Sequence, residues 1–312
     1  MSISYNADTK NETLTAFATG LYADNKALSL ADFIAPDVPT GTTDGDYFEF
    51  DRGIPFQVID TVIDEETSPQ KVKANATKRK YSIELHGLQC GVTDWSRRKA
   101  GDAADLTTEN KIRTLLSTQF VSREFQLSQA IAKTTKKETV TWLGEAGKSK
   151  DIVAELDQYI LTVSQACGGV VMPNRMTIPL KLWLAVKNHP SIRERLQGIS
   201  ASAALSTFAG MLGNPEIEIR VGSLCYNAAA RGKGEPNYQP IYGDSILLFY
   251  NEQNPTTESF GFMKTFVVDG LETAQVHSLR DDTPPARDKH YLLWAQELKE
   301  TAAHAGLLIN VQ

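Results

Sequence analysis

Residues 107–137 read TTENKIRTLLSTQFVSREFQLSQAIAKTTKK, and this stretch decides the fold. Large apolar residues recur along one face at helical spacing, namely Ile112, Leu115, Leu116, Phe120, Leu127 and Ile131. Glu109 near the start and Lys133 near the end have the charges that the dipole of a helix favours at those ends. The pattern predicts one helix of about 30 residues, which at ~1.5 Å per residue is roughly 45 Å long. A helix of that length is typical of the backbone of a flat, extended domain.

The segment before this helix has the alternating pattern of strands. Alternation occurs in Tyr47–Phe50, Phe56–Ile59 and Lys80–His86. Between the strands, residues 64–80 are first acidic and then basic, with almost nothing to bury. We expect a long hairpin that reaches away from the main body and needs a neighbour to lie on, because an isolated two-stranded ribbon is marginal in water.

The first 45 residues show only short apolar pieces, such as Leu28–Ile34, followed by Pro36, Pro39 and the turn run Gly41–Gly45. We expect them to form an extended arm. An arm with that many large apolar residues should lie on another surface rather than in water.

The rest of the chain mixes helices and strands. We expect helices at 151–166, 180–188 and 203–212, and strands at 139–143, 175–178, 216–221 and 245–250. Residues 281–288 resemble a linker, and the apolar stretches Tyr291–Ala295 and Leu307–Val311 follow it. Neither stretch has an apolar partner nearby in sequence, so we expect both to pack against the stripe of the long helix.

The composition and charge of the chain limit the classes of function that it can have. The chain has 312 residues, 41% of them hydrophobic, which allows roughly two domains. Its formal charge of -6 disfavours a protein that grips nucleic acid phosphates, although a container for DNA needs only weak attraction. The three cysteines form no CxxC pair, so we expect reduced thiols and not disulfides or zinc ligands. We find no membrane span or leader pattern, and we expect synthesis in the cytoplasm.

The sequence suggests no catalytic, cofactor or metal residues. Gly144–Ser149 resembles a phosphate-binding loop, but that motif needs a glycine at the position of Trp142. We expect a surface turn there. The histidines lack metal-ligand spacing, and His189, before Pro190, is placed to satisfy carbonyls at a helix end.

The basic runs Lys78–Lys80 and Arg97–Lys99 could contact nucleic acid, yet each is short and lies near acidic residues. We favour salt bridges between subunits. The candidate contact residues are Glu65, Glu66, Lys71, Lys73, Lys78, Arg79, Lys80, Arg97 and Arg98.

The order of these elements, together with phrases such as Met172–Pro179, Asn188–Ile192 and Tyr242–Asp244, resembles the tailed-bacteriophage major capsid proteins, which have the Hong Kong 97-like fold. The resemblance implies an α+β fold in five parts. These are an N-terminal arm (1–45), an E-loop hairpin with its flanks (46–100), a peripheral domain with the spine helix (101–150), an axial domain (151–270) and a return to the peripheral domain (271–312).

The resemblance also implies the function, which is assembly into an icosahedral shell around double-stranded DNA. The implied partners are further copies in pentamers and hexamers, a portal protein, a separate scaffolding protein, decoration proteins and DNA bound without sequence preference, with no membrane and no cofactor. Family members that cross-link covalently use lysine and asparagine, but nothing marks a catalytic acid near Lys71, Lys73 or Asn310. Two alternatives remain, an encapsulin-like nanocompartment and an oligomeric α/β enzyme.

Overall fold

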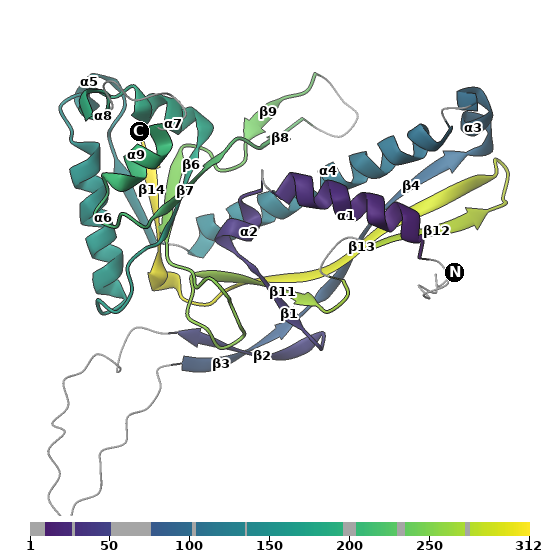
Figure 1. Ribbon diagram of the computed structural model, residues 1–312, viewed down its shortest axis with the longest axis horizontal. Coiled ribbons are helices and arrows are strands. Elements are labelled where there is room, and N and C mark those ends of the chain that lie inside the picture. Colours follow the sequence, from purple (N-terminus) through teal and green to yellow (C-terminus); the bar gives the residue numbers. More distant parts are fainter. Residues whose placement is uncertain are drawn as a thin grey trace, which may run out of the picture.

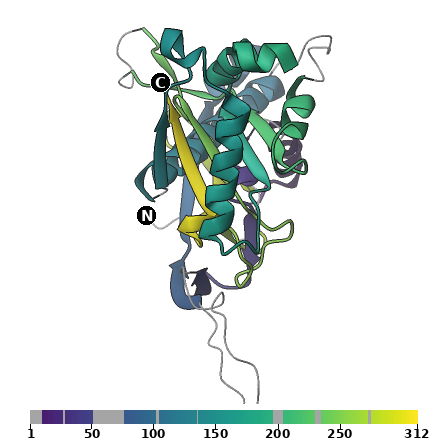
Figure 2. The same ribbon diagram turned by 90° about the vertical axis from the view of Figure 1, so that its left-hand side faces the viewer.

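The computed structural model describes residues 10–26, 29–50, 76–101, 104–134, 136–195, 204–229, 235–271 and 275–312. Two parts stand side by side: an elongated part built on the long helix, and a more compact part built on a second sheet (Figures 1 and 2). Helices and strands are both abundant in the two parts, as the predicted α+β class requires.

The long helix α4 runs from Ala104 to Thr134 and lies along one face of a five-stranded sheet. The strands are β1 (Asp37–Thr40), β4 (Glu84–Thr93), β11 (Met263–Val268), β12 (Gln275–Asp281) and β13 (Arg287–Glu300). Strand β13 is 14 residues long and pairs antiparallel with β4, β11 and β12. The predicted spine helix is confirmed to within a few residues.

The apolar stripe of α4 packs against the first of the two C-terminal stretches. Ile112 and Leu116 share one core cluster with Leu292 and Trp294 of β13. Farther along the helix, Leu127 and Ile131 belong to the large core around the second sheet, which also holds Leu307, Leu308, Ile309 and Val311. The predicted partner is therefore confirmed for Tyr291–Ala295, and direct packing on Leu307–Val311 stays a prediction.

The second sheet has the strand order β5-β14-β10-β6-β7. Its strands are β5 (Lys136–Val140), β6 (Arg175–Pro179), β7 (Glu218–Gly222), β10 (Ser245–Phe249) and β14 (Gly306–Val311). Around it lie α5 (Gly144–Gly147), α6 (Ile152–Ala166), α7 (Leu180–Lys187), α8 (Pro190–Arg195) and α9 (Ala204–Gly210). The helices expected at 151–166, 180–188 and 203–212 are thus confirmed as α6, α7 and α9.

One expectation about this sheet is wrong. Residues 271–312 do not all return to the first sheet, because β14 lies in the second sheet between β5 and β10. Gly306 to Ile309 are all buried, so the strand is covered on both faces. A strand buried on both faces needs a central position, and the second sheet provides it.

The expected extended N-terminal arm is also wrong for the described residues. Residues Glu12–Lys26 form helix α1, which packs on α4 and β12, and Ala31–Ile34 form the short helix α2. Ala18 and Tyr22 are buried, with Leu14, Phe17 and Leu21 packed beside them. These residues recur three and four positions apart, which is the spacing of a helix face. The stripe was not recognised from the sequence because the residue at its centre, Ala18, is small.

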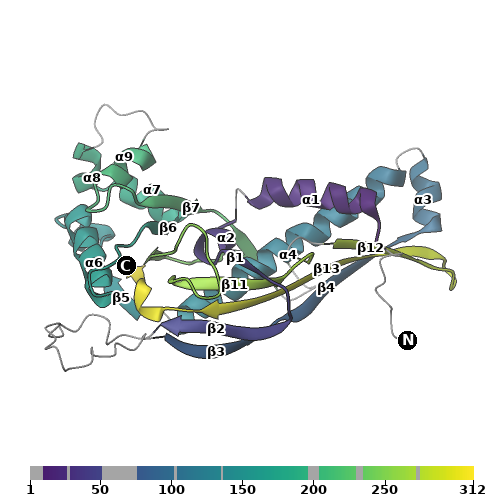
Figure 3. The same cartoon turned by 60° about the horizontal axis from the view of Figure 1, so that its bottom comes forward.

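The predicted hairpin begins as the two-stranded ribbon β2 (Asp44–Phe50) and β3 (Ala76–Ser82), paired antiparallel. The ribbon packs through Tyr47 and Tyr81 on Phe266 and Ala295, on the sheet face opposite the helices (Figure 3). The hairpin tip, with Glu65, Glu66, Lys71 and Lys73, lies outside the described residues. The remaining elements are α3 (Asp94–Ala100), the short pair β8 (Cys225–Asn227) and β9 (Tyr238–Pro240), and a 3-10 turn at Ala303–Ala305.

Candidate intersubunit surfaces

The basic run on the ribbon is exposed and partly paired within its own chain. Lys78, Arg79 and Lys80 all lie on β3 with exposed side chains. The Arg79 guanidinium forms an ion pair with Glu49 on β2, at 2.5 Å between Nε and Oε2. The Lys78 ammonium lies 5.8 Å from the ring centroid of Phe48. Such exposed pairs are weak, so these cations remain free to exchange partners.

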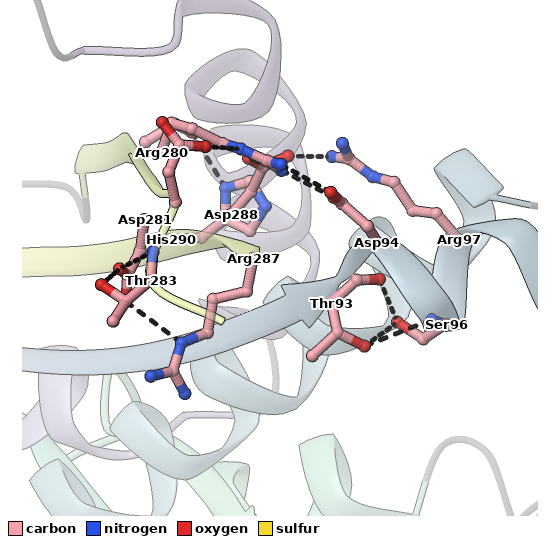
Figure 4. A network of polar contacts seen from close by, with 12 residues as sticks. Thr93, Asp94, Ser96, Arg97, Arg280, Asp281, Thr283, Arg287, Asp288 and His290 are labelled. Atoms are coloured by element: carbon pink, nitrogen blue, oxygen red, sulfur yellow. Dashed lines mark hydrogen bonds and ion pairs between the residues drawn. The ribbon is translucent and has the colours of Figure 1, made fainter. Parts of the chain in front are cut away.

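The second basic run lies on α3 at the far tip of the elongated part, inside a dense ionic network (Figure 4). Arg280 of β12 binds both carboxylate oxygens of Asp94, at 2.6 and 2.5 Å, and one oxygen of Asp288 at 3.1 Å. Arg97 pairs with the other oxygen of Asp288 at 2.5 Å. Arg97 therefore forms an ion pair within its own subunit, between α3 and β13. Arg98 is exposed and has no ion pair within the described part of the chain.

The same network fixes the β12–β13 hairpin. Hydrogen bonds from Lys289, Thr283 and Arg287 lower the pKa of Asp281 strongly, so this carboxylate stays charged at any ordinary pH. Bonds to Asp94, Asp282 and Asp288 raise the pKa of the Arg280 guanidinium in the same way. Several acidic and basic side chains at the tip are therefore paired with one another.

A buried polar cluster joins the N-terminal segment to α4. The Arg123 guanidinium contacts Asp32 at 2.8 Å, Asp37 at 2.6 Å and the Tyr22 hydroxyl at 2.9 Å. Burial raises the pKa of Tyr22 to about 12. Arg123 therefore ties residues 22–37 to the long helix.

The next residue, Glu124, is fully buried and accepts three hydrogen bonds. Its Oε1 accepts from the Ser29 hydroxyl at 2.6 Å and from the Ala31 N–H at 2.8 Å, and its Oε2 accepts from the Tyr242 hydroxyl. Burial, and then the neighbouring Glu124 carboxylate, raises the pKa of Tyr242 well above its usual value. We did not predict this cluster. The sequence does contain a signal for it. The charged residues Arg123 and Glu124 lie between Phe120 and Leu127, at positions where the apolar stripe of the helix would otherwise continue.

The outward face of α4 is a third distinctive surface. Between Asn110 and Lys133 the sole carboxylate is the buried Glu124. The exposed side chains of this span are Asn110, Arg113, Thr114, Ser117, Thr118, Ser122, Gln126, Gln129, Ala132 and Lys133. The hydroxyls of Thr114, Ser117 and Thr118 donate to helix carbonyls four residues earlier. The surface is therefore neutral to weakly basic over ~36 Å of helix.

The glycine-rich segment Gly144–Ser149 serves packing. Its first four residues form the one-turn helix α5 rather than the expected open turn. A side chain at Gly147 would begin 2.2 Å from the Trp142 backbone, so that glycine is required for close approach. Lys148 pairs with exposed Glu145 at 2.5 Å, and His189 Nε2 bonds the Gly147 carbonyl at 3.0 Å. His189 thus binds a carbonyl at a helix end, as predicted, although the helix is α5.

No group of three or more His, Cys, Asp or Glu side chains among the described residues could hold a metal ion. Among the described helices, none is long and apolar enough to cross a membrane.

The chain is similar to known phage proteins in sequence and in structure. No protein-family model matches the chain. The major capsid protein of Pseudomonas phage JBD67 is 24% identical over 248 residues, covering 74% of each chain. Among solved structures, a phage-related protein from Bordetella bronchiseptica RB50 matches with a TM-score of 0.72 and 19% identity, covering 97% of both chains. The capsid of Cyanophage P-SCSP1u matches with a TM-score of 0.55 and 11% identity, covering 90% of this chain and 87% of that one.

These likenesses extend over both sheets and the long helix that joins them. Because the curated relative is a phage capsid protein, the encapsulin-like alternative is not favoured, and the enzyme alternative has no matching relative among these proteins. Self-association into a shell, in a structural and not an enzymatic role, is the activity common to such proteins. With its spine helix, its ribbon and its two sheets, the chain is a major capsid protein of the tailed-phage type with the Hong Kong 97-like fold.

Proposed function

We propose that copies of this chain close into an icosahedral shell of pentamers and hexamers around double-stranded DNA, as the capsid of a virion. The observation that carries the proposal is the fold, which matches capsid structures over nearly the whole chain. Repeated heterologous contacts around five-fold and six-fold centres generate such closed shells. A portal protein, a separate scaffolding protein and decoration proteins complete the proposed assembly, and synthesis takes place in the host cytoplasm.

The basic residues of the ribbon and of α3 are part of this proposal. Lys78, Arg79 and Lys80 are exposed on β3, and Arg98 is exposed on α3. We assign them to salt bridges with neighbouring subunits, together with Glu65, Glu66, Lys71 and Lys73 of the hairpin. Arg97 also forms an ion pair with Asp288 of its own chain, so we expect it to contribute less to these contacts than Arg98.

The outward face of α4 supports DNA as the content of the shell. Duplex DNA carries one negative charge per ~1.7 Å of its axis, so a wall lined with carboxylates would repel it, while a strongly basic wall would hold it too tightly. Exposed helix positions normally favour Glu and Lys. Ser117, Thr118 and Ser122 occupy such positions instead, with Arg113 and Lys133 as the only exposed charges of that span. We assign this face to the wall of the DNA-filled cavity.

The shell itself is tested by electron microscopy of purified particles, followed by nuclease treatment. Closed particles with nuclease-resistant DNA are the expected result. Discrete small oligomers would overturn the shell, and closed particles that hold a cargo protein and no DNA would overturn the assigned content.

The lining is tested with paired charge substitutions. Thr118→Glu with Ser122→Glu places two carboxylates on α4, and Ala154→Glu with Gln158→Glu places two at the same spacing on α6. We expect the α4 variant to form shells that package less DNA, with the α6 variant unchanged. Equal DNA content in all three particles would show that α4 does not face the DNA.

A further inference from the structure

Strand β4 is the border strand of the first sheet, with no other described strand beyond it (Figure 3). It pairs with β13 along one side, from Glu84 opposite Gln296 to Thr93 opposite Arg287. In an antiparallel strand, successive residues direct their N–H and C=O groups to alternate sides. The Asp94 N–H donates to the Ala286 carbonyl, on the β13 side, so the odd-numbered residues of β4 direct theirs outward.

The two ends of this outward edge are occupied within the subunit. The Ile83 N–H donates to the Thr43 carbonyl at 2.8 Å, and the Gly91 carbonyl accepts from the Lys111 ammonium. Between these ends lie Leu85, Gly87 and Gln89, which are all exposed. Within the described part of the chain, their outward backbone groups have no hydrogen-bond partner.

The opposite border of the sheet is covered in part. On β12, the Val276 carbonyl accepts from the Asn11 N–H at 3.0 Å, and the Val276 N–H donates to the Thr15 hydroxyl at 3.2 Å. The start of α1 therefore covers β12 at Val276. Proteins usually protect open edges with lysine, proline, charge or a bulge.

Strand β4 has none of these side-chain devices between Leu85 and Val92, where the sequence is LHGLQCGV. Leu85 is also 57% exposed, so an apolar side chain lies on this open edge. An edge with open hydrogen-bonding groups and apolar side chains is a template for another strand. The hydrogen bonds at Ile83 and Gly91 occupy the two ends of this edge. Three outward residues remain for pairing, and Gly87 is the middle one.

We propose that β4 pairs antiparallel with β4 of a second copy across a two-fold axis centred on Gly87. Leu85 then lies opposite Gln89 of the partner subunit, and the reverse pair forms by symmetry. A two-fold contact is self-complementary, so one strand supplies both sides of it. Three such residue pairs exchange about six backbone hydrogen bonds. The inference rests on the proposed shell, in which one modest contact is repeated many times.

Register-specific disulfide trapping tests the pairing. The double variant Leu85→Cys with Gln89→Cys is made in a background carrying Cys90→Ser and Cys225→Ser, which removes the native thiols that are not buried. In the proposed register the two new thiols face each other across residue pairs with Cα atoms about 5.5 Å apart, within disulfide range. Mild oxidation of assembled shells should give a covalent dimer on a non-reducing gel.

The single variants are the matched controls. Two copies of residue 85, or two of residue 89, would lie about 13 Å apart in this register, too far for a disulfide. Dimers in the double variant alone support the proposal. Dimers from either single variant, or none from the double variant, overturn it, including the case in which a strand of another protein covers β4. Electron microscopy of the same samples keeps this failure distinct from failure to form shells.

A second variant removes one outward donor without adding a thiol. Gln89→Pro deletes an N–H that has no partner within the described subunit, and proline is tolerated on edge strands. We expect a folded subunit with an unchanged circular dichroism spectrum and at least a tenfold loss of closed shells. A folded Gln89→Pro subunit that assembles normally would contradict the pairing.

Discussion

Removal of the Tyr242 hydroxyl tests whether the buried Glu124 carboxylate stabilises the fold through its hydrogen bonds. Tyr242→Phe keeps the ring and deletes one of the three donors to Glu124. A hydrogen bond to a charged group contributes about 1.5–3 kcal/mol, so we expect the free energy of unfolding to fall by about 2 kcal/mol. The carboxylate keeps its bonds from Ser29 and Ala31, which limits the loss.

The matched control is Tyr226→Phe. The Tyr226 hydroxyl also donates a side-chain hydrogen bond, at 3.1 Å to Gln239, but both partners are neutral and that bond is exposed. We expect a loss below about 0.5 kcal/mol for this surface substitution. Urea unfolding of the unassembled subunit measures both variants under the same conditions.

A double-mutant cycle then isolates the bond itself. In a Glu124→Ala background the Tyr242 hydroxyl has lost its acceptor, so Tyr242→Phe should cost nothing or should stabilise. The expected coupling energy is about 1.5–3 kcal/mol. Equal effects of Tyr242→Phe in the two backgrounds would refute the assigned role of Glu124.

Three further predictions concern other parts of the chain. Phe120→Ala removes a ring that is 7% exposed and lies 5.0 Å from Tyr22. It should cost about 3–5 kcal/mol, measured as a lower melting temperature, with unchanged melting as the contrary result. Lys148→Ala should leave stability and assembly unchanged, because Lys148 is exposed and pairs with exposed Glu145; calorimetric ATP binding that this variant abolishes would contradict our interpretation of Gly144–Ser149. Burial lowers the pKa of Lys264 from 10.5 to about 8. Between these pH values the unfolded chain binds more protons, so wild-type stability should rise with pH by up to about 3 kcal/mol relative to Lys264→Met. Parallel pH profiles of the two proteins would refute this.

Long periodic segments were the predictable part of the fold. The stripe from Ile112 to Ile131 specified α4, and the apolar run at Tyr291 specified a partner for it. The same local patterns could not place β14 in the second sheet, because strand order depends on contacts between residues far apart in the chain. Helix α1 was missed for a different reason. Ala18 fills a site where two helices approach closely, and a small residue gives little apolar signal.

The candidate site was predicted less well than the fold. Charge runs indicated Lys78–Lys80 and Arg97–Arg98, but the sequence could not show that Asp288 engages Arg97 from 191 positions away. The open edge of β4 had no local signature either. An edge strand differs from a central one only in what lies beside it, and LHGLQCGV would suit both positions.

The link between β13 and β14 has a mechanical consequence. Thr301 and Ala302 both donate their N–H groups to the Phe262 carbonyl, and Ala305 accepts from the Tyr250 N–H. The link is buried at Thr301, Ala302 and Ala305, so it offers no free hinge between the two sheets. The two sheets of one subunit therefore move together as one rigid body. Where the proposed shell changes curvature between five-fold and six-fold positions, the strain therefore passes to the contacts between subunits. The salt bridges that we propose for β3 are weak and exchangeable, so they are suited to accommodate that change.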